Sequence, residues 1–470
     1  MTYNLVCGFE THVELSTKTK IFCSCPTDFG DQPNSHVCPK CIAEPGTLPV
    51  VNKQTFIYAI RAGLATNCSI NKIVHFDRKN YTYPDLPKAY QLTQFTEPIC
   101  VSGHIKLDSG KIIRINRIHL EEDAGKLLHK GEYTFIDYNR GAVPLIEIVT
   151  EPDINSIEEA REYLEKLQLI LRHIDVSDCK MEEGSMRCDV NISVNKPGEK
   201  LGTRSEIKNM NSLSFIEKAI AYEYSRHVSA IQNGEMLYQE TRRYNESDGT
   251  TSAMREKENA QDYRYYDDPD IPTIFIEEHF IESIKRTLPE LPADIKNRYL
   301  GLGLSPTETD LLIKYKKVAD YFSEAIKTGD PKILSNYILG EIFRLLETEA
   351  KKENFDIMIS PLQLSSLSNA QKSGKINAQL AKKALSEMLK SGKSWEELIS
   401  ESDMQEISEI DLISYCNEAI YNNSNAISDY LSGKEKALKA ILGYVMKRTK
   451  GKANPEKTEN LLIELITKKK

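Results

Sequence analysis

The stretch that decides the fold reads Leu5-Val6-Cys7-Gly8-Phe9-Glu10-Thr11-His12-Val13-Glu14-Leu15. Its odd positions are mostly apolar, whereas Glu10, His12 and Glu14 occupy even positions between them. Successive side chains of a β-strand point to opposite faces, so this alternation predicts a strand. One face of that strand then presents a carboxylate, an imidazole and a second carboxylate together.

Further strand and helix patterns fill the chain up to about residue 290. Residues 186–194 alternate in the same way, and this places Asp189 on the polar side. Residues 142–149 form a nearly continuous apolar run that predicts a buried strand, in which Glu147 needs a partner. Apolar residues at helical spacing predict helices at 156–174 and 212–233.

The sequence changes character after the proline pair at 289 and 292, where strand signals become rare. Amphipathic helices are predicted at 308–327, 331–351, 360–373 and 377–390. Because 470 residues exceed what one core usually organises, we expect several domains. We predict an α+β fold: a cradle domain with a mixed or antiparallel sheet over 1–290, a helical domain over 291–402 and a small helical tail over 403–470.

Composition excludes several classes of protein. The chain is 40% hydrophobic, has no run of eighteen apolar residues and lacks a signal-peptide start, so we expect it in the cytosol. A net charge of -8 argues against a generally basic nucleic-acid binder. Only the end is basic, since eleven lysines and arginines from Lys434 onward face four glutamates, which leaves +7. Such a module can attract an RNA backbone, although lysine-rich tails are also common solvated ends.

Four of the ten cysteines form a tight cluster with the spacing Cys23-x-Cys25, twelve residues, Cys38-x-x-Cys41. Two close thiol pairs joined by a loop suit a tetrahedral Zn²⁺ that staples the loop. The alternative is four free thiols in a reducing compartment.

A second metal site is indicated by Glu10 and His12 together with the acidic run His119-Leu120-Glu121-Glu122-Asp123. Carboxylates with one imidazole suit Mg²⁺ or Mn²⁺, which also hold nucleotide phosphates. Cations cluster near the predicted turns at 75–81, 138–141 and 204–209, and such groups can clamp phosphates or form ordinary surface ion pairs. Neither a Gly-x-x-x-x-Gly-Lys-Ser/Thr loop nor a Gly-x-Gly-x-x-Gly fingerprint is present.

Read in order, these fragments resemble one family. The matching blocks include Phe76-Asp77-Arg78-Lys79-Asn80-Tyr81, Met181-Glu182-Glu183-Gly184-Ser185-Met186-Arg187-Cys188-Asp189 and residues 8–15, 83–88, 119–125, 144–149, 176–178, 206–212 and 262–265. The sequence resembles the B subunits of the glutamine-dependent aspartyl/glutamyl-tRNA amidotransferases over essentially its whole length. Small departures are Phe9, Thr11 and residues 266–269, where the family usually has Leu, Val and Phe-Pro-Glu-Pro.

The resemblance implies a reaction and partners. A complex of A, B and C subunits would convert Glu-tRNA(Gln), and often Asp-tRNA(Asn), to the amide form with ATP and glutamine. The B subunit would phosphorylate the side-chain carboxylate, and ammonia released by the A subunit would displace the phosphate. The tail of the B subunit would contact the tRNA.

Phosphoryl transfer needs a metal ion and cations around the γ-phosphate, and this requirement gives the residues roles. We expect Mg²⁺ or Mn²⁺ ligands among Glu10, His12, Glu122, Asp189 and Glu206, with Glu121 as the first substitute. We expect phosphate contacts, and with them catalytic roles, from Lys79, Arg140 and Lys208. Glu147 would stand behind the ligands or line the ammonia route.

Two other functions remain open at this point. One is a non-catalytic, zinc-stapled scaffold that binds tRNA while another subunit performs the chemistry. The other is a free-standing ATP-dependent ligase for a small carboxylic acid, which would need its own ammonia source. The sequence holds no glutaminase signature that could provide one.

Overall fold

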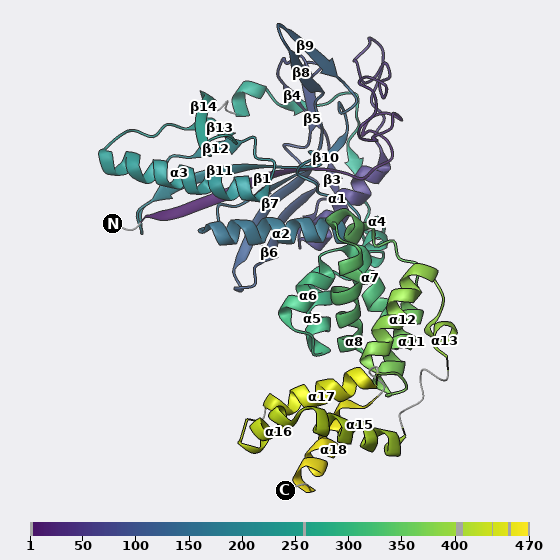
Figure 1. Ribbon diagram of the computed structural model, residues 1–470. Coiled ribbons are helices and arrows are strands. Elements are labelled where there is room, and N and C mark those ends of the chain that lie inside the picture. Colours follow the sequence, from purple (N-terminus) through teal and green to yellow (C-terminus); the bar gives the residue numbers. More distant parts are fainter. Residues whose placement is uncertain (1–2, 257–259, 401–407, 435, 450–452, 469–470) are drawn as a thin grey trace. The chain divides into compact units, whose positions relative to one another are not determined.

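The computed structural model of the chain describes residues 3–256, 260–400, 408–434, 436–449 and 453–468 (Figure 1). It divides into two compact units, Met1–Pro292 and Ala293–Lys470. The first unit contains every strand of the described residues, and the second is helical. This confirms the predicted α+β class. The finer division into domains at 291–402 and 403–470 stays a prediction.

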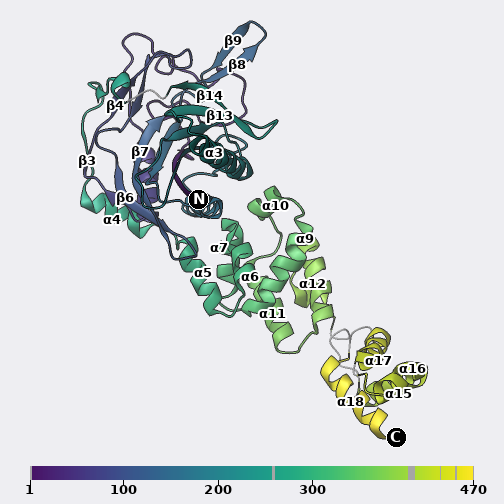
Figure 2. The same ribbon diagram turned by 90° about the vertical axis from the view of Figure 1, so that its left-hand side faces the viewer.

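One large sheet organises the first unit. In the described residues twelve strands join in the order β14-β13-β12-β11-β1-β10-β7-β5-β4-β15, and β6 pairs with both β7 and β2. Figure 2 shows β4, β6, β7, β13 and β14 of this sheet from a second side. All pairs are antiparallel except β12 with β13. The strands are β1 (Asn4–Glu14), β2 (Ser69–Ile70), β4 (Asp77–Asn80), β5 (Tyr90–Thr93), β6 (Cys100–Lys106), β7 (Ile112–Glu122), β10 (Pro144–Thr150), β11 (Met186–Asn195), β12 (Ser205–Lys208), β13 (Glu240–Asn245), β14 (Thr250–Glu256) and β15 (Tyr266–Asp267).

The strand that was predicted from residues 5–15 lies in the middle of this sheet as β1. It pairs with β10 on one side and with β11 on the other, which are the strands predicted from 142–149 and 186–194. Phe9 stacks on Tyr163 with ring centroids 5.7 Å apart, so the odd positions of β1 face the helices. The even positions therefore face the other side of the sheet.

Three helices cover the apolar face: α1 (Lys53–Ala65), α2 (Ile157–His173) and α3 (Leu213–Asn233). Each begins after a side-chain cap, because Asn52, Ser156 and Ser212 accept a hydrogen bond from the first turn. Helices α2 and α3 confirm the segments predicted at 156–174 and 212–233. Among the helices of the described ranges, none has the length and apolar content that a membrane crossing requires.

Smaller elements complete the first unit. Strands β8 (Lys126–Lys130) and β9 (Tyr133–Asp137) form a hairpin, and β3 (Ile73–Val74) pairs with β16 (Ile274–Phe275). The remaining helical turns are η1 (Ala260–Tyr263) and α4 (Glu278–Arg286). The cysteine-containing segment 23–41 has no regular secondary structure.

The second unit shows that two predicted helices were wrong in their continuity. The segment 308–327 is split into α6 (Pro306–Ile313) and α7 (Lys316–Ala325), because Tyr315 adopts an extended backbone and packs its ring against Phe343. The segment 331–351 is helical without interruption from α8 (Pro331–Asn336) through the π-helical η2 (Tyr337–Ile342) to α9 (Phe343–Leu345), and a separate helix, α10 (Glu349–Asn354), follows. Thr348 caps α10 and restarts the chain in a new direction.

The other helices of this unit agree with their sequence patterns. Segments 360–373 and 377–390 are α11 (Pro361–Lys372) and α12 (Ala378–Ser391), followed by α13 (Trp395–Leu398), while α5 (Pro292–Gly301) begins the unit. The tail consists of α15 (Glu409–Asn422), α16 (Ser424–Leu431), α17 (Lys436–Arg448) and α18 (Pro455–Lys468). Its buried side chains, among them Cys416, Ile441 and Leu462, form a hydrophobic cluster of their own.

Candidate functional site

The polar face of the sheet brings together side chains from five neighbouring strands, β12, β11, β1, β10 and β7. The register pairs His12 with Glu147 and Glu147 with His119, so these three side chains form a row across β1, β10 and β7. It also pairs Glu10 with Asp189. The alternation read from residues 5–15 is therefore the pattern that positions the candidate site.

Glu147 is the centre of the first cluster. Its Oε2 lies 3.5 Å from His12 Nε2 and 3.3 Å from His119 Nε2. Glu121 lies beside them, with Oε2 3.7 Å from His119 Nε2. Ligand atoms of His12, Glu121 and Glu147 all fall within 4.8 Å of one another, so one metal ion could contact all three. The sequence predicted that a buried Glu147 needs a partner, and the structure gives it two, the imidazoles of His12 and His119.

Charges within this cluster stabilise one another. Burial opposes ionisation of Glu147, yet its contacts with His119 and His12 hold the pKa of this carboxyl well below its ordinary value. Burial alone would lower the pKa of His12, but the hydrogen bond and charge of Glu147 raise it. The cluster therefore holds charged groups away from water, which is a frequent property of active sites.

Lys79 supplies a cation to the same cluster. Burial opposes its charge, but the carboxylate of Glu121 raises the pKa of the Lys79 ammonium. Its Nζ lies 5.1 Å from the ring centre of Tyr263 and 5.8 Å from that of Tyr81. These contacts leave a protonated amine held near carboxylates by aromatic rings, a position from which it can bind an anion.

A second cluster spans β1, β11 and β12. Lys208 Nζ lies 2.5 Å from Asp189 Oδ2 and 3.4 Å from Glu206 Oε1. Asn191 donates a hydrogen bond of 2.8 Å to Glu10 Oε1. Burial opposes the charge of Lys208, but Asp189 raises the pKa of its ammonium. Three predicted metal ligands and one predicted phosphate contact thus share one region of the sheet.

A third cluster contains Arg140, which was predicted as a phosphate contact. Asp123 Oδ2 lies 3.5 Å from Arg140 Nε and 2.7 Å from a terminal nitrogen of Arg187. The Arg140 guanidinium also donates to the backbone oxygens of Ala124 and Gly125. Burial, and next the charge of Asp123, raise the pKa of Glu14 to about 7.

Glu122 lies apart from Glu10 and His12. Adjacent residues of β7 point to opposite faces, so Glu121 faces the candidate site and Glu122 faces away from it. Glu122 Oε2 lies 2.6 Å from Lys88 Nζ, and its other oxygen accepts a hydrogen bond of 2.8 Å from the Leu92 amide. The structure therefore brings Glu121, which was expected only as a substitute, next to His12.

The four clustered cysteines converge as their spacing predicted. Cys41 Sγ lies 3.7 Å from Cys23 Sγ, 3.8 Å from Cys38 Sγ and 3.9 Å from Cys25 Sγ. A tetrahedral Zn²⁺ with bonds of about 2.3 Å requires sulfur atoms about 3.8 Å apart. The thiols therefore fit zinc, and all ten cysteines of the chain are free of disulfides.

A buried lysine and several amides connect the cysteine loop to the end of the β8–β9 hairpin. Lys20 Nζ donates to Cys41 Sγ at 3.6 Å and to the Tyr138 backbone oxygen at 2.9 Å. Asn34 Nδ2 donates to the Ile136 oxygen at 2.9 Å, and Asn139 Nδ2 donates to the Gln32 oxygen at 2.7 Å. The loop is thereby fixed to the residues that directly precede Arg140.

Sequence reasoning missed several members of these clusters. His119 was read as part of an acidic run, although its spacing of two from Glu121 already placed both on one face of a strand. The alternation of residues 186–194 placed Arg187 on the polar side with Asp189, but neither its partner Asp123 nor the contact of Lys20 with Cys41 had a local signal, because these partners are distant in the sequence. A further group, His75, Asp77 and Asp267, lies outside the five strands and has ligand atoms within 4.8 Å of one another.

Comparison with known proteins agrees with this geometry. Residues 5–282 match the family described as the GatB/GatE catalytic domain, and residues 320–466 match the GatB domain. A protein of Clostridium botulinum strain Okra, named as the B subunit of an aspartyl/glutamyl-tRNA(Asn/Gln) amidotransferase, is 49% identical over 476 residues, which span the whole of both chains. A protein of the same name from Carboxydothermus hydrogenoformans is 46% identical over 99% of each chain.

The catalytic-domain match covers all five strands that carry the three clusters, as well as the four cysteines. Both relatives are matched from end to end, so the likeness includes the helical unit. The chain therefore belongs to the family of aspartyl/glutamyl-tRNA(Asn/Gln) amidotransferase B subunits, and its first unit carries that family's catalytic domain.

Proposed function

We propose that this chain uses ATP to phosphorylate the side-chain carboxylate of Glu-tRNA(Gln), of Asp-tRNA(Asn) or of both, and then amidates the product with ammonia. The observation that carries this proposal is the cluster of His12, Glu121, His119 and Glu147 on the polar face, with Lys79 beside it. The amidotransferase names of the relatives supply the substrate class.

The donor set suits hard divalent cations. His12, Glu121 and Glu147 would hold one Mg²⁺ or Mn²⁺, because two carboxylates with one imidazole match the ligand preference of these ions. Glu10, Asp189 and Glu206 provide a second group of carboxylates, for which Lys208 is the cation in the structure. When bound, such ions would neutralise the charge that develops on the transferred phosphoryl group. We propose Glu121 in the position first expected for Glu122.

Three cations would bind phosphate oxygens. Lys79 lies beside the first cluster and Lys208 in the second, whereas Arg140 has its Nε and one terminal nitrogen engaged by backbone oxygens. Positioned cations hold the γ-phosphate in line with the attacking carboxylate and stabilise its charge.

The reaction balances in two steps. A carboxylate oxygen forms a bond to the γ-phosphorus, the bond to ADP breaks, and an acyl phosphate results. The nitrogen of ammonia then attacks the carbonyl carbon, the carbon–oxygen bond breaks, and inorganic phosphate leaves while ammonia loses a proton. A carboxylate is a poor acyl donor, so the first step makes the second possible.

Partners complete the function. Ammonia would come from a glutaminase A subunit with a small C subunit in the same complex, as the naming of the relatives as B subunits suggests. The four thiols would hold a structural Zn²⁺, and free cysteines throughout the chain favour a reducing compartment such as the cytosol. The basic tail would contact the tRNA.

Replacing His12 tests the proposal directly. In the assembled complex, His12→Ala should reduce transfer of phosphate from ATP to Glu-tRNA(Gln) at least about a hundredfold, because a metal ligand and a partner of Glu147 are lost. Glutamine hydrolysis and tRNA binding should persist. The matched control is His129→Ala, which changes an exposed histidine of the β8–β9 hairpin. Normal phosphorylation by the His12 variant would instead favour a non-catalytic scaffold.

A further inference from the structure

Arg243 occupies an unusual position beside the second cluster. It lies on β13 directly opposite Lys208 of β12 in the parallel register. Lys208 is neutralised by Asp189 and Glu206. For the exposed Arg243 guanidinium, no hydrogen bond or ion pair is found with any residue that the structure describes. Because Lys208 already has two carboxylate partners, Arg243 is a cation beside this cluster that can bind an added anion.

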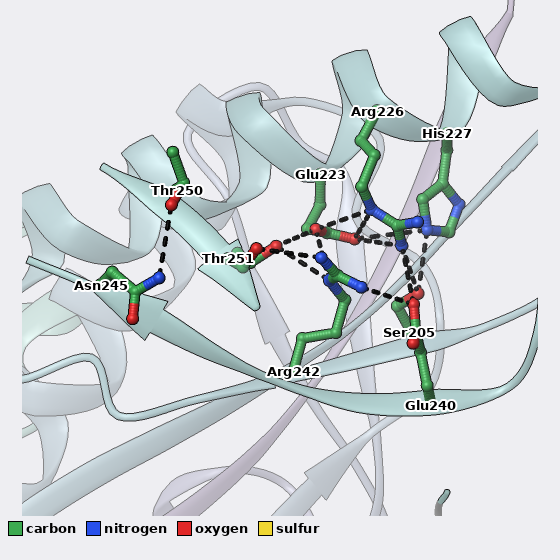
Figure 3. A network of polar contacts seen from close by, with 9 residues as sticks. All are labelled: Ser205, Glu223, Arg226, His227, Glu240, Arg242, Asn245, Thr250 and Thr251. Carbon is green, nitrogen blue, oxygen red and sulfur yellow. Dashed lines mark hydrogen bonds and ion pairs between the residues drawn. The ribbon is translucent and has the colours of Figure 1, made fainter. Parts of the chain in front are cut away.

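The contacts of the neighbouring Arg242 show which face of β13 Arg243 occupies. Figure 3 shows Arg242 between Glu223 and Glu240 on the helix-covered side, where its Nε lies 3.0 Å from a Glu223 oxygen and its Nη1 lies 2.7 Å from a Glu240 oxygen. Arg242 also donates to Thr251 Oγ1 at 2.9 Å. Because alternate residues of a strand point to opposite faces, these contacts fix Arg243 on the polar face with Lys208.

A cavity of ≈ 760 Å³ lies at this place. Its lining includes Arg243, Lys208, Asp189 and Arg187, together with the segments 181–184, 209–211 and 244–247. That volume falls within the range of small-molecule sites, which is about 300–1,000 Å³. The cavity is thus large enough for a phosphate group with the nucleoside attached to it.

The segment that leads into helix α3 also lines the cavity. Segment 209–211 directly precedes Ser212, the N-cap of this 21-residue helix, and the first turn of the helix carries no acidic residue. The N-terminus of a helix bears partial positive charge and unpaired amide groups, which bind anions. No residue of α3 itself is among the described residues that line the cavity, so the inference rests on Arg243.

Acidic side chains also line the cavity. Glu182, Glu183 and Glu246 are exposed and lie on connecting segments, whereas Asp189 lies on β11 and is paired with Lys208. Lys180 Nζ lies 3.1 Å from Glu183 Oε1. The cavity is therefore of mixed charge, and recognition of an anion rests on the local guanidinium and not on an overall positive field.

We propose that Arg243 is a phosphate-binding residue of this cavity. Its planar guanidinium can bind two phosphate oxygens at once, a geometry that lysine does not offer. The phosphate comes either from ATP or from the 3′ end of the aminoacyl-tRNA, both of which bear this group. This inference rests on the proposed function, because it assumes that both substrates meet on the polar face of the sheet.

The test compares Arg243→Ala, Arg243→Lys and the unchanged chain in the assembled complex. Phosphate transfer from radiolabelled ATP is measured while ATP and Glu-tRNA(Gln) are varied in turn. Arg243→Ala should raise KM for one substrate about tenfold to a hundredfold, as expected for a lost charge-assisted hydrogen bond. Arg243→Lys should give an intermediate value. Arg161→Ala, which removes an exposed arginine of α2, is the matched control and should leave both KM values unchanged.

The outcomes separate the two sources and the two proposals. A raised KM for ATP assigns the phosphate to the nucleotide, and a raised KM for Glu-tRNA(Gln) assigns it to the tRNA. Unchanged KM values in Arg243→Ala overturn the inference while the unchanged chain still phosphorylates its substrate. If the unchanged chain shows no phosphate transfer, the proposed function itself fails.

Discussion

Glu223 is a buried carboxylate on α3, on the helix-covered face of the sheet. It is fully buried on α3 and contacts Arg226 at 2.8 Å, Arg242 at 3.0 Å and His227 at 3.4 Å (Figure 3). Burial alone would raise its pKa, but His227, Arg226 and Thr251 hold the pKa of this carboxyl at about 2. The Glu223 carboxylate therefore connects α3 with β13 and β14, on the face of the sheet opposite to Arg243.

The stability that Glu223 provides depends on pH in a defined direction. Its pKa is lower in the folded chain than the ordinary value of 4.5, so the contribution is complete above about pH 4.5 and is lost as pH falls toward 2. At neutral pH, Glu223→Gln should lower the free energy of opening of β13 by about 2 kcal/mol, because the partly buried Arg226 and Arg242 each lose one of their two carboxylate partners. Hydrogen exchange measures this opening locally.

The control for this prediction is Glu217→Gln on the same helix. Glu217 pairs with Arg161 at 2.9 Å near the surface, so its loss should cost less than about 1 kcal/mol. The difference between the two variants should shrink as the pH is lowered below 4.5. Equal effects of both changes at pH 7 would show that Glu223 has no special role.

At the scale of elements, hydrogen bonds connect the irregular cysteine segment with the end of the β8–β9 hairpin. The segment 23–41 has no strand or helix, yet its amides fix it to residues 136–139 after the β8–β9 hairpin. Lys20 joins the thiol cluster to the Tyr138 oxygen. A metal bound by the four thiols would thus hold the segment that leads to Arg140.

Loss of one thiol should release the metal and the loop together. Cys38→Ser should lower bound zinc by about one equivalent per chain, because three thiolates hold the ion far less tightly than four. Residues 23–41 should then become sensitive to limited proteolysis. Cys68→Ser, which changes a buried cysteine outside the cluster, should keep the zinc content. Retention of zinc by the Cys38 variant would exclude the four-thiolate site.

At the scale of the whole molecule, the candidate site lies in the first unit, and the second unit is helical. The first unit holds the three clusters and the thiol site, whereas the tail helices α15 to α18 bury a core of their own. Charge is divided as well, since the acidic chain ends in a segment with an excess of +7 from Lys434 onward. A basic segment at the end of an acidic chain would give the proposed tRNA substrate a defined place to bind.

Removal of the tail tests this division. A chain that ends at Ser408 should bind tRNA about tenfold more weakly or worse, and the dependence of affinity on salt should flatten because phosphate contacts are lost. Glutamine hydrolysis by the complex should be unaffected. A full-length chain with Lys383 and Lys390 of α12 changed to alanine serves as the control. The same affinity and salt dependence in the truncated and complete chains would exclude a tRNA contact by the tail.

The sequence by itself determined the three central strands, the helices α2, α3, α11 and α12, and the convergence of the four thiols, because these depend on local periodicity and spacing. Period-two alternation placed Glu10 and His12 on one face, and two cysteine pairs predicted a convergence that the sulfur distances support. The family resemblance, carried by short blocks, supplied the reaction class.

Only the tertiary structure decided which groups meet across strands. It set Glu147 between His12 and His119, chose Glu121 over Glu122 for the polar face, and left Arg243 opposite Lys208. It also broke the helix predicted at 308–327, where Tyr315 is extended and packs on Phe343, and it divided the helix predicted at 331–351 between Leu346 and Thr348. Strand pairing joins residues that are more than a hundred positions apart, and no local pattern encodes that register.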